Sequence, residues 1–103
     1  LHDACLKGDL NAVKEIINDG ASLNERDEYG DTAMHTSCRY GHAGVTRILI
    51  SARGNGNVQN KNGDTPLHIA VSLKLRKITN LLIRAGVNIS TLNYVSVVGW
   101  LVG

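Results

Sequence analysis

Large aromatic side chains are scarce in this sequence of 103 residues: phenylalanine is absent, and aromatic residues make up only 4%. A core built on aromatic packing is therefore excluded, and burial has to come from Leu, Ile, Val and Ala within a hydrophobic content of 43%. Side chains of this size suit thin, layered helix packing better than one thick core. At this length the chain holds at most one domain.

Long runs of apolar or basic residues are also missing. No apolar stretch reaches the roughly 18 residues that a membrane span needs, so we expect no membrane partner. The net charge is only +2, from 11 Lys and Arg against 9 Asp and Glu, without a lysine- or arginine-rich run. This is a weak electrostatic footprint for a nucleic-acid binder, and we expect no nucleic-acid partner.

What the sequence has in abundance is internal repetition. Residues 30–35 (GDTAMH) return as residues 63–68 (GDTPLH), 33 positions later. His2 lies another 33 positions before the histidine of the first segment, and Leu49 and Leu82 share the same offset. A fixed period of this length is the signature of a stacked repeat architecture.

Each period predicts a helix, a turn, a second helix and a longer loop. Thr32 suits a helix N-cap, where its hydroxyl accepts a bond from an unpaired N–H. Pro66 suits the first helical turn, where its missing N–H costs nothing. In the second period we expect a first helix over residues 33–40, a left-handed terminator at Gly41 and a second helix over residues 45–52.

These motifs resemble the ankyrin repeat. The resemblance rests on residues 63–70 (GDTPLHIA), the Gly41-His42 break, the Leu-Leu-Ile of residues 81–83 and the Gly-Ala-Ser-Leu-Asn of residues 20–24. It covers residues 1–92, as repeats at about 1–26, 27–59 and 60–92. The resemblance implies an all-α solenoid of stacked helix–turn–helix units joined by β-turn loops.

The sequence departs from the family pattern in three places. Lys74-Leu75 replaces the Gly-His break of the third repeat, which should strain or lengthen that helix end. Arg53 stands where the family has a helix-ending glycine and must take a left-handed conformation at some cost. Residues 93–103 match no repeat, and their apolar, β-branched sequence fits a degenerate fourth repeat, a hydrophobic cap or non-native sequence.

Two sets of residues could suggest chemistry. His35, Cys38 and His42 are zinc-ligand types at helical spacing, but the resemblance gives the histidine of each repeat a structural bond to the backbone of the adjoining turn. Cys5 and Cys38 occupy equivalent helices, which stack roughly 8–10 Å apart. A disulfide needs Cα atoms within roughly 7 Å, so we expect reduced, buried thiols and an intracellular protein. We expect no metal, cofactor or catalytic site.

Loop asparagines raise a further alternative. In the family, a loop asparagine such as Asn57 can be hydroxylated. The other interpretation is that Asn57 bonds to the backbone between repeats, which is the role that we favour.

The resemblance places partner binding on the turn tips and on the exposed face of the first helices. Tyr29 and Tyr40, two of the three tyrosines, fall on this face, and Tyr and Arg are frequent in binding hot spots. The mixture of charges around them favours another protein or peptide as the partner. The candidate binding residues are Arg26, Glu28, Tyr29, Asp31, Arg39, Tyr40, Lys61, Asn62, Asp64 and Leu73.

The function that follows is a non-enzymatic protein-interaction module of an intracellular protein. Because the chain opens at Leu1 without a methionine, we expect it to be part of a larger protein. The alternative is a structural segment that continues a longer stack and positions neighbouring domains. We expect a monomer, although stacked repeats rely on their neighbours for burial and could associate end to end.

Overall fold

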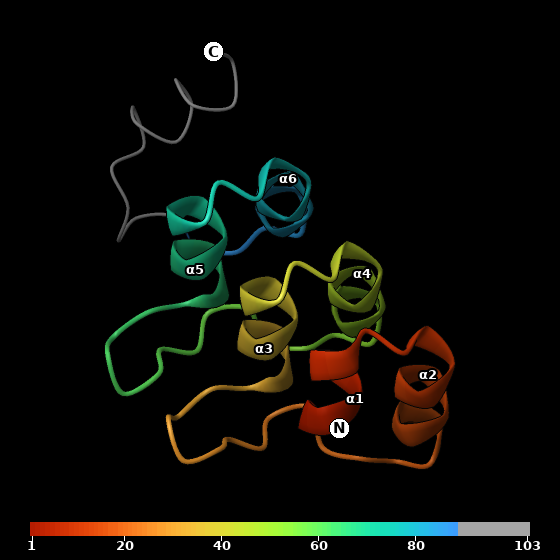
Figure 1. The fold of residues 1–103 in the computed structure, drawn as a ribbon. Helices are drawn as coiled ribbons and strands as arrows, with labels where there is room; N and C mark the ends of the chain where they lie inside the picture. Colours follow the sequence, from red (N-terminus) through yellow and green to blue (C-terminus); the bar gives the residue numbers. More distant parts are fainter. Residues whose placement is uncertain (89–103) are drawn as a thin grey trace.

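The computed structural model of the protein describes residues 1–88. Within these residues it consists of six helices without strands: α1 (His2–Lys7), α2 (Leu10–Asn18), α3 (Ala33–Arg39), α4 (Ala43–Ser51), α5 (Pro66–Ser72) and α6 (Arg76–Arg84). The helices α1, α3 and α5 form one layer, and α2, α4 and α6 form a second layer beside it (Figure 1). The all-helical prediction is confirmed. The expectation for residues 93–103 lies outside the described residues.

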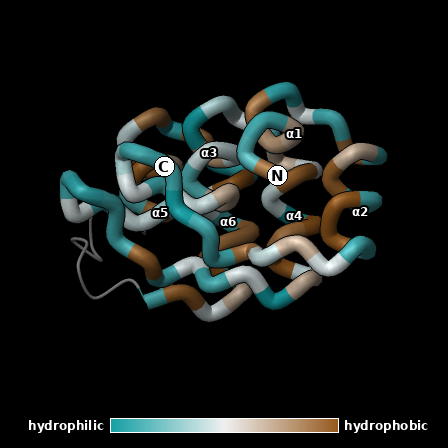
Figure 2. The backbone as a smooth tube through the Cα atoms, turned by 90° about the horizontal axis from the view of Figure 1, so that it is seen from below, coloured by the Kyte–Doolittle hydropathy of each residue, from teal (hydrophilic) through white to brown (hydrophobic). Residues whose placement is uncertain are grey.

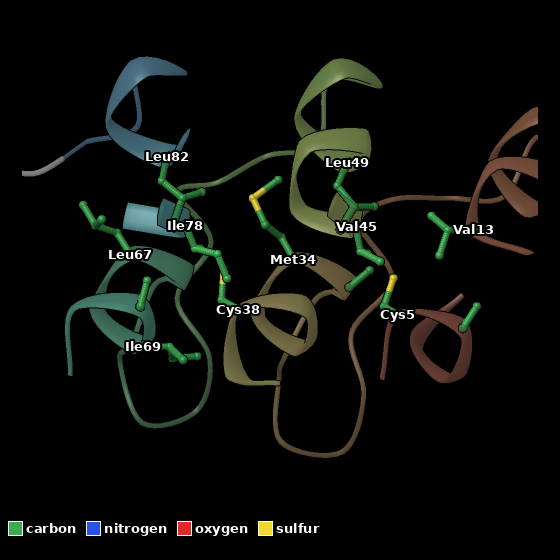
Figure 3. Close-up of a cluster of buried hydrophobic side chains, with 13 residues drawn as sticks. Cys5, Val13, Met34, Cys38, Val45, Leu49, Leu67, Ile69, Ile78 and Leu82 are labelled. Atoms are coloured by element: carbon green, nitrogen blue, oxygen red, sulfur yellow. The ribbon is translucent and has the colours of Figure 1, made fainter. Parts of the chain in front are cut away.

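Apolar side chains from both layers meet between them and form one continuous core. Val13, Leu49 and Leu82 reach it from the second layer, and Cys5 and Leu67 reach it from the first (Figure 3). By contrast, the long loops that precede α3 and α5 are largely hydrophilic (Figure 2). Because each helix pair buries its apolar side against the next pair, no repeat has a complete core alone.

The two cysteines are free and buried, as predicted. Burial raises the pKa of the Cys5 thiol to about 11 and that of the Cys38 thiol to about 12. Both thiols are therefore protonated at neutral pH, and they pack as small apolar groups.

The first-layer helices begin as the sequence predicts. Thr32 and Thr65 are the N-caps of α3 and α5, and Pro66 occupies the first turn of α5. The Thr65 hydroxyl accepts the N–H of His68 at 3.3 Å, while His68 Nδ1 accepts the N–H of Thr65 at 3.0 Å. These reciprocal bonds satisfy two backbone donors that the start of a helix otherwise leaves unpaired.

Histidines at the same repeat position tie each repeat to the next. The Nε2–H of His2 donates to the carbonyl oxygen of Asp31 at 2.9 Å, and that of His35 donates to the carbonyl oxygen of Asp64 at 2.8 Å. His35 is fully buried, and its Nδ1 accepts the N–H of Thr32 at 3.1 Å. The predicted structural role of these two histidines is confirmed.

Left-handed backbone occurs at two residues that are not glycine. Arg53 has a φ of 67° and Lys74 a φ of 59°, whereas the equivalent of Lys74 in the second repeat, Gly41, has a φ of 73°. The expected strain at both positions is thus present. The α5 helix has seven residues, the same number as α3, so the alternative expectation of a lengthened helix end is wrong.

We predict that Arg53→Gly raises the free energy of unfolding by about 1 kcal/mol, because glycine removes the clash of Cβ in the left-handed region. Urea denaturation of both proteins measures the change. Arg53→Ala removes the same charge but keeps the Cβ, so it should bring no such gain. An equal gain from Arg53→Ala would show that the charge, and not the backbone, sets the cost.

The buried imidazole of His35 should make stability depend on pH. Its pKa lies below the ordinary 6.5, chiefly because burial disfavours the charged ring, and the bond to the Asp64 carbonyl opposes this only in part. The unfolded chain therefore binds the proton first. The stability that depends on the neutral His35 ring should be fully present above pH 6.5. It should be lost as the pH drops from there toward the folded-state pKa of His35.

Thermal unfolding followed by circular dichroism between pH 8 and pH 5 measures this dependence. His35→Gln removes the titrating group and should flatten the part of the slope that His35 causes. An identical slope in the variant would assign the pH dependence to other groups.

Candidate functional site

A groove of about 300 Å³ lies where α1, α3 and the loop before α3 meet. Its lining residues come from α1, from the loop before α3, and from α3 and its C-cap. The lining residues are His2, Asp3, Leu6, Asp27, Tyr29, Asp31, Thr36, Arg39 and Tyr40. The groove therefore brings together four of the ten residues that the sequence suggested for partner binding.

Exposed apolar surface gathers at this groove. Tyr29 is 63% exposed, Tyr40 is 52% exposed and Leu6 is 42% exposed, and these are three of the five large hydrophobic residues that stand out from the described surface. Single exposed hydrophobic residues are ordinary on a protein, but a cluster beside a hollow is typical of an interaction site.

Asp31 lines the groove, but its side chain is buried and does not stand out from the surface as the sequence suggested. Its side chain is only 1% exposed, and its carboxylate forms an ion pair with Arg39. The other carboxylate oxygen accepts the Nδ2–H of Asn60 at 2.9 Å. Asp31 thus holds the guanidinium of Arg39, whose side chain remains 39% exposed, at the rim of the groove.

The loop that carries Tyr29 is held by hydrogen bonds of its own. One Asp27 carboxylate oxygen accepts the N–H groups of Tyr29 and Asp31, both at 2.9 Å. In the next repeat, Asn60 Oδ1 accepts from Asn62 at 3.0 Å and from Asp64 at 2.9 Å. These side chains replace the backbone pairing that a loop otherwise lacks.

Neighbouring loops are also bonded to each other. The N–H of Lys61 donates to the carbonyl oxygen of Tyr29 at 3.0 Å. A Cβ added at Gly30 would lie 2.9 Å from that Lys61 nitrogen, so only glycine permits this approach. The backbone of Tyr29 is therefore fixed by the repeat that follows it.

The remaining candidates lie outside the groove. Those on the two loops are exposed except Asp64, which is half-buried, and Leu73 is 50% exposed beyond the end of α5. They are Arg26, Glu28, Lys61, Asn62, Asp64 and Leu73. The groove-lining His2, Asp3, Asp27 and Thr36 were not among the candidates, and no signal in the sequence separates them from residues with a structural role.

The residues that resembled zinc ligands have other partners. His35 bonds to backbone through both ring nitrogens, and His42 Nε2 donates to the carbonyl oxygen of Leu6 at 2.9 Å. Within residues 1–88, no three His, Cys, Asp or Glu side chains are grouped so that they could hold a metal ion. In the same part of the chain, no helix has the length and apolar character to cross a membrane.

Asn57 bonds across repeats, as the favoured interpretation predicts. Its Oδ1 accepts the N–H of Asn88 at 2.7 Å, and its own N–H donates to Asn55 Oδ1 at 2.9 Å. The loop asparagine therefore links the second repeat to the end of the third.

The contacts of Asn60 predict a large effect from a near-isosteric change. In Asn60→Asp, the group that donates to the buried Asp31 carboxylate becomes a second carboxylate at the same short distance. We expect a loss of about 2–4 kcal/mol in the free energy of unfolding, because a buried charge loses a donor and gains a like charge. Protonation of either carboxyl should recover part of this loss at low pH.

Asp27→Asn is the matched control, since Asp27 holds the equivalent loop position and only accepts N–H bonds there. It should cost less than about 1 kcal/mol. Urea unfolding of both variants at pH 7 compares them, and equal losses would contradict the role of Asn60 as a donor to Asp31.

In a comparison with known protein families, a family model described as ankyrin repeats, in three copies, matches residues 1–93. The match spans the six helices and all of the groove.

Proposed function

We propose that this chain, which belongs to the ankyrin repeat family, binds a segment of a partner protein in the groove between its first two repeats. Ankyrin repeats are in general non-catalytic modules for protein–protein interaction. The single observation that carries the proposal is the cluster of Tyr29, Tyr40 and Leu6 around one hollow.

The chemistry of the groove fits a peptide with mixed character. The tyrosine rings offer broad apolar faces with a hydroxyl at the end, and tyrosine loses little conformational entropy when it binds. Arg39 adds a planar donor that can pair with a carboxylate or a carbonyl oxygen. We therefore propose a partner segment with an apolar side chain between these rings and an acidic or carbonyl group near Arg39.

The mechanism is rigid display. Tyr29 lies on a loop that hydrogen bonds from Asp27, Lys61 and His2 hold in place, and Arg39 is paired with the buried Asp31. A surface that is already ordered before binding loses less entropy when the complex forms. The exposed residues of the next loop, Lys61 among them, extend the same face toward the third repeat.

We expect Tyr40→Ala to weaken partner binding by roughly 1–3 kcal/mol without unfolding the stack, because half of this side chain already faces solvent. The first measurement is capture from a cell lysate with wild type and with Tyr29→Ala/Tyr40→Ala, identified by mass spectrometry. Titration of the captured protein against each single variant then gives the free-energy change.

Leu10→Ala serves as the control, since Leu10 is as exposed as Leu6 but lies on the second layer. All variants are compared at matched thermal stability. A partner lost with the tyrosine variant and kept with the control supports the groove. An unchanged set of proteins favours the alternative, a structural segment that positions neighbouring domains.

A further inference from the structure

We propose that a second surface, at the opposite end of the helices from the long loops, binds an acidic protein segment that carries one apolar side chain. The tight turns between α3 and α4 and between α5 and α6 lie side by side along this edge (Figure 1). Between them is a hollow of about 290 Å³, here called the edge hollow. It shares no lining residue with the groove and does not depend on it.

Two successive repeat boundaries are built differently, and the edge hollow lies at the second of them. Between the first and second repeats, the ring of His42 covers Gly8, and a Cβ added there would lie 2.7 Å from the ring. Between the second and third repeats, the residue equivalent to His42 is Leu75. Its methyl group would lie 3.9 Å from a Cβ added at Gly41. Leu75 therefore leaves more room over its glycine than the ring of His42 does.

The walls and the rim of the edge hollow differ in character. Gly41 and Ala43 form a wall without bulky side chains, and Leu75 and Ile78 provide apolar surface. Three cationic residues, Lys74, Arg76 and Lys77, also line it, and all three are exposed. An apolar hollow with a positive rim is the complement of an apolar side chain flanked by carboxylates.

The distribution of charged residues along the sequence also favours a positive surface at the edge hollow. Residues 60–88 hold five Lys and Arg against one acidic residue, Asp64, whereas residues 1–26 hold three basic and five acidic residues. After Asp64 the sequence contains no acidic residue at all. The positive potential of the rim is therefore not offset by acidic groups further along the chain.

Lys74 is displayed at a structural cost. It adopts a left-handed backbone, with a φ of 59°, at the position where the first two repeats have Gly8 and Gly41. Strained backbone at a residue other than glycine is concentrated at functional sites. At this position the third repeat has a cationic side chain beside the hollow in place of the unstrained glycine.

The shape favours a protein segment over other anionic partners. A lipid surface is met by protruding apolar residues, but Leu75 is half-buried and lines a hollow. Single-stranded nucleic acid stacks its bases on aromatic rings, and none of the residues that line the edge hollow is aromatic. A hollow of this size accommodates one side chain of leucine or phenylalanine size.

The test is an array of peptides that each contain one Leu, Ile, Phe or Met flanked by Asp and Glu. A second set has every Asp and Glu replaced by Asn and Gln. Wild-type protein should bind the acidic set in preference to the amide set, and more weakly as salt is raised. The best acidic peptide is then labelled with fluorescein, and its dissociation constant is measured by fluorescence anisotropy.

Two variants address the rim and the hollow separately. Lys74→Glu/Lys77→Glu reverses the rim and should weaken binding by about tenfold or more. Ala43→Leu fills the hollow but keeps every charge, and should also weaken binding about tenfold. If Ala43→Leu lowers the thermal midpoint, Ala43→Val replaces it. Lys14→Glu/Arg47→Glu makes the same charge change on exposed positions of α2 and α4, and should leave most of the affinity intact.

Three results would overturn the proposal. One is equal binding of the acidic and amide sets. Another is an equal loss in the Lys14→Glu/Arg47→Glu control, which would show attraction by net charge alone. The third is binding to phosphatidylserine vesicles that exceeds binding to every peptide, which would assign the rim to a membrane surface. Unchanged binding by Tyr29→Ala/Tyr40→Ala separates this site from the groove.

Discussion

The stack depends on one interaction that recurs with the period of the sequence: a histidine N–H donated to a carbonyl of the next repeat. His2 reaches Asp31, and 33 residues later His35 reaches Asp64. Each donor stands in the first turn of a first-layer helix, and each acceptor lies in the loop that starts the following repeat. The bond therefore fixes the distance between helix and loop, and the groove lies in that interval. A loop position that would be mobile in isolation becomes part of a rigid surface.

The overall fold could be predicted from the sequence because the features that determine it are local and repeated. Caps at Thr32 and Thr65, the proline at position 66 and the terminating Gly41 each act within a few residues. A period that returns these signals in register leaves little choice of architecture. The strain at Arg53 and Lys74 was predictable for the same reason, since a departure from a repeated pattern is visible without any knowledge of contacts.

The candidate site was predictable only in part, because its details depend on residues far apart in the sequence. Aspartate is typical of a protein surface, and Asp31 is buried because Asn60 and Arg39 both bind its carboxylate. Leu6 joins Tyr29 and Tyr40 only when α1 packs beside α3. The edge hollow likewise lies where Leu75 leaves more room over Gly41 than the ring of His42 leaves over Gly8, and this difference depends on how the repeats pack.

The contacts of Asp31 constrain how the sequence can change. A carboxylate in the second repeat is satisfied by an amide from the third and by a guanidinium from the end of its own helix. Its equivalent, Asp64, has Ser72 where Asp31 has Arg39, so the third repeat does not reproduce the arrangement. The amino acids at positions 31, 39 and 60 should consequently change together among related sequences. Repeats that look like copies of one module are thus not interchangeable, and a recombination point between residues 31 and 60 would separate three side chains that are functional only as a set.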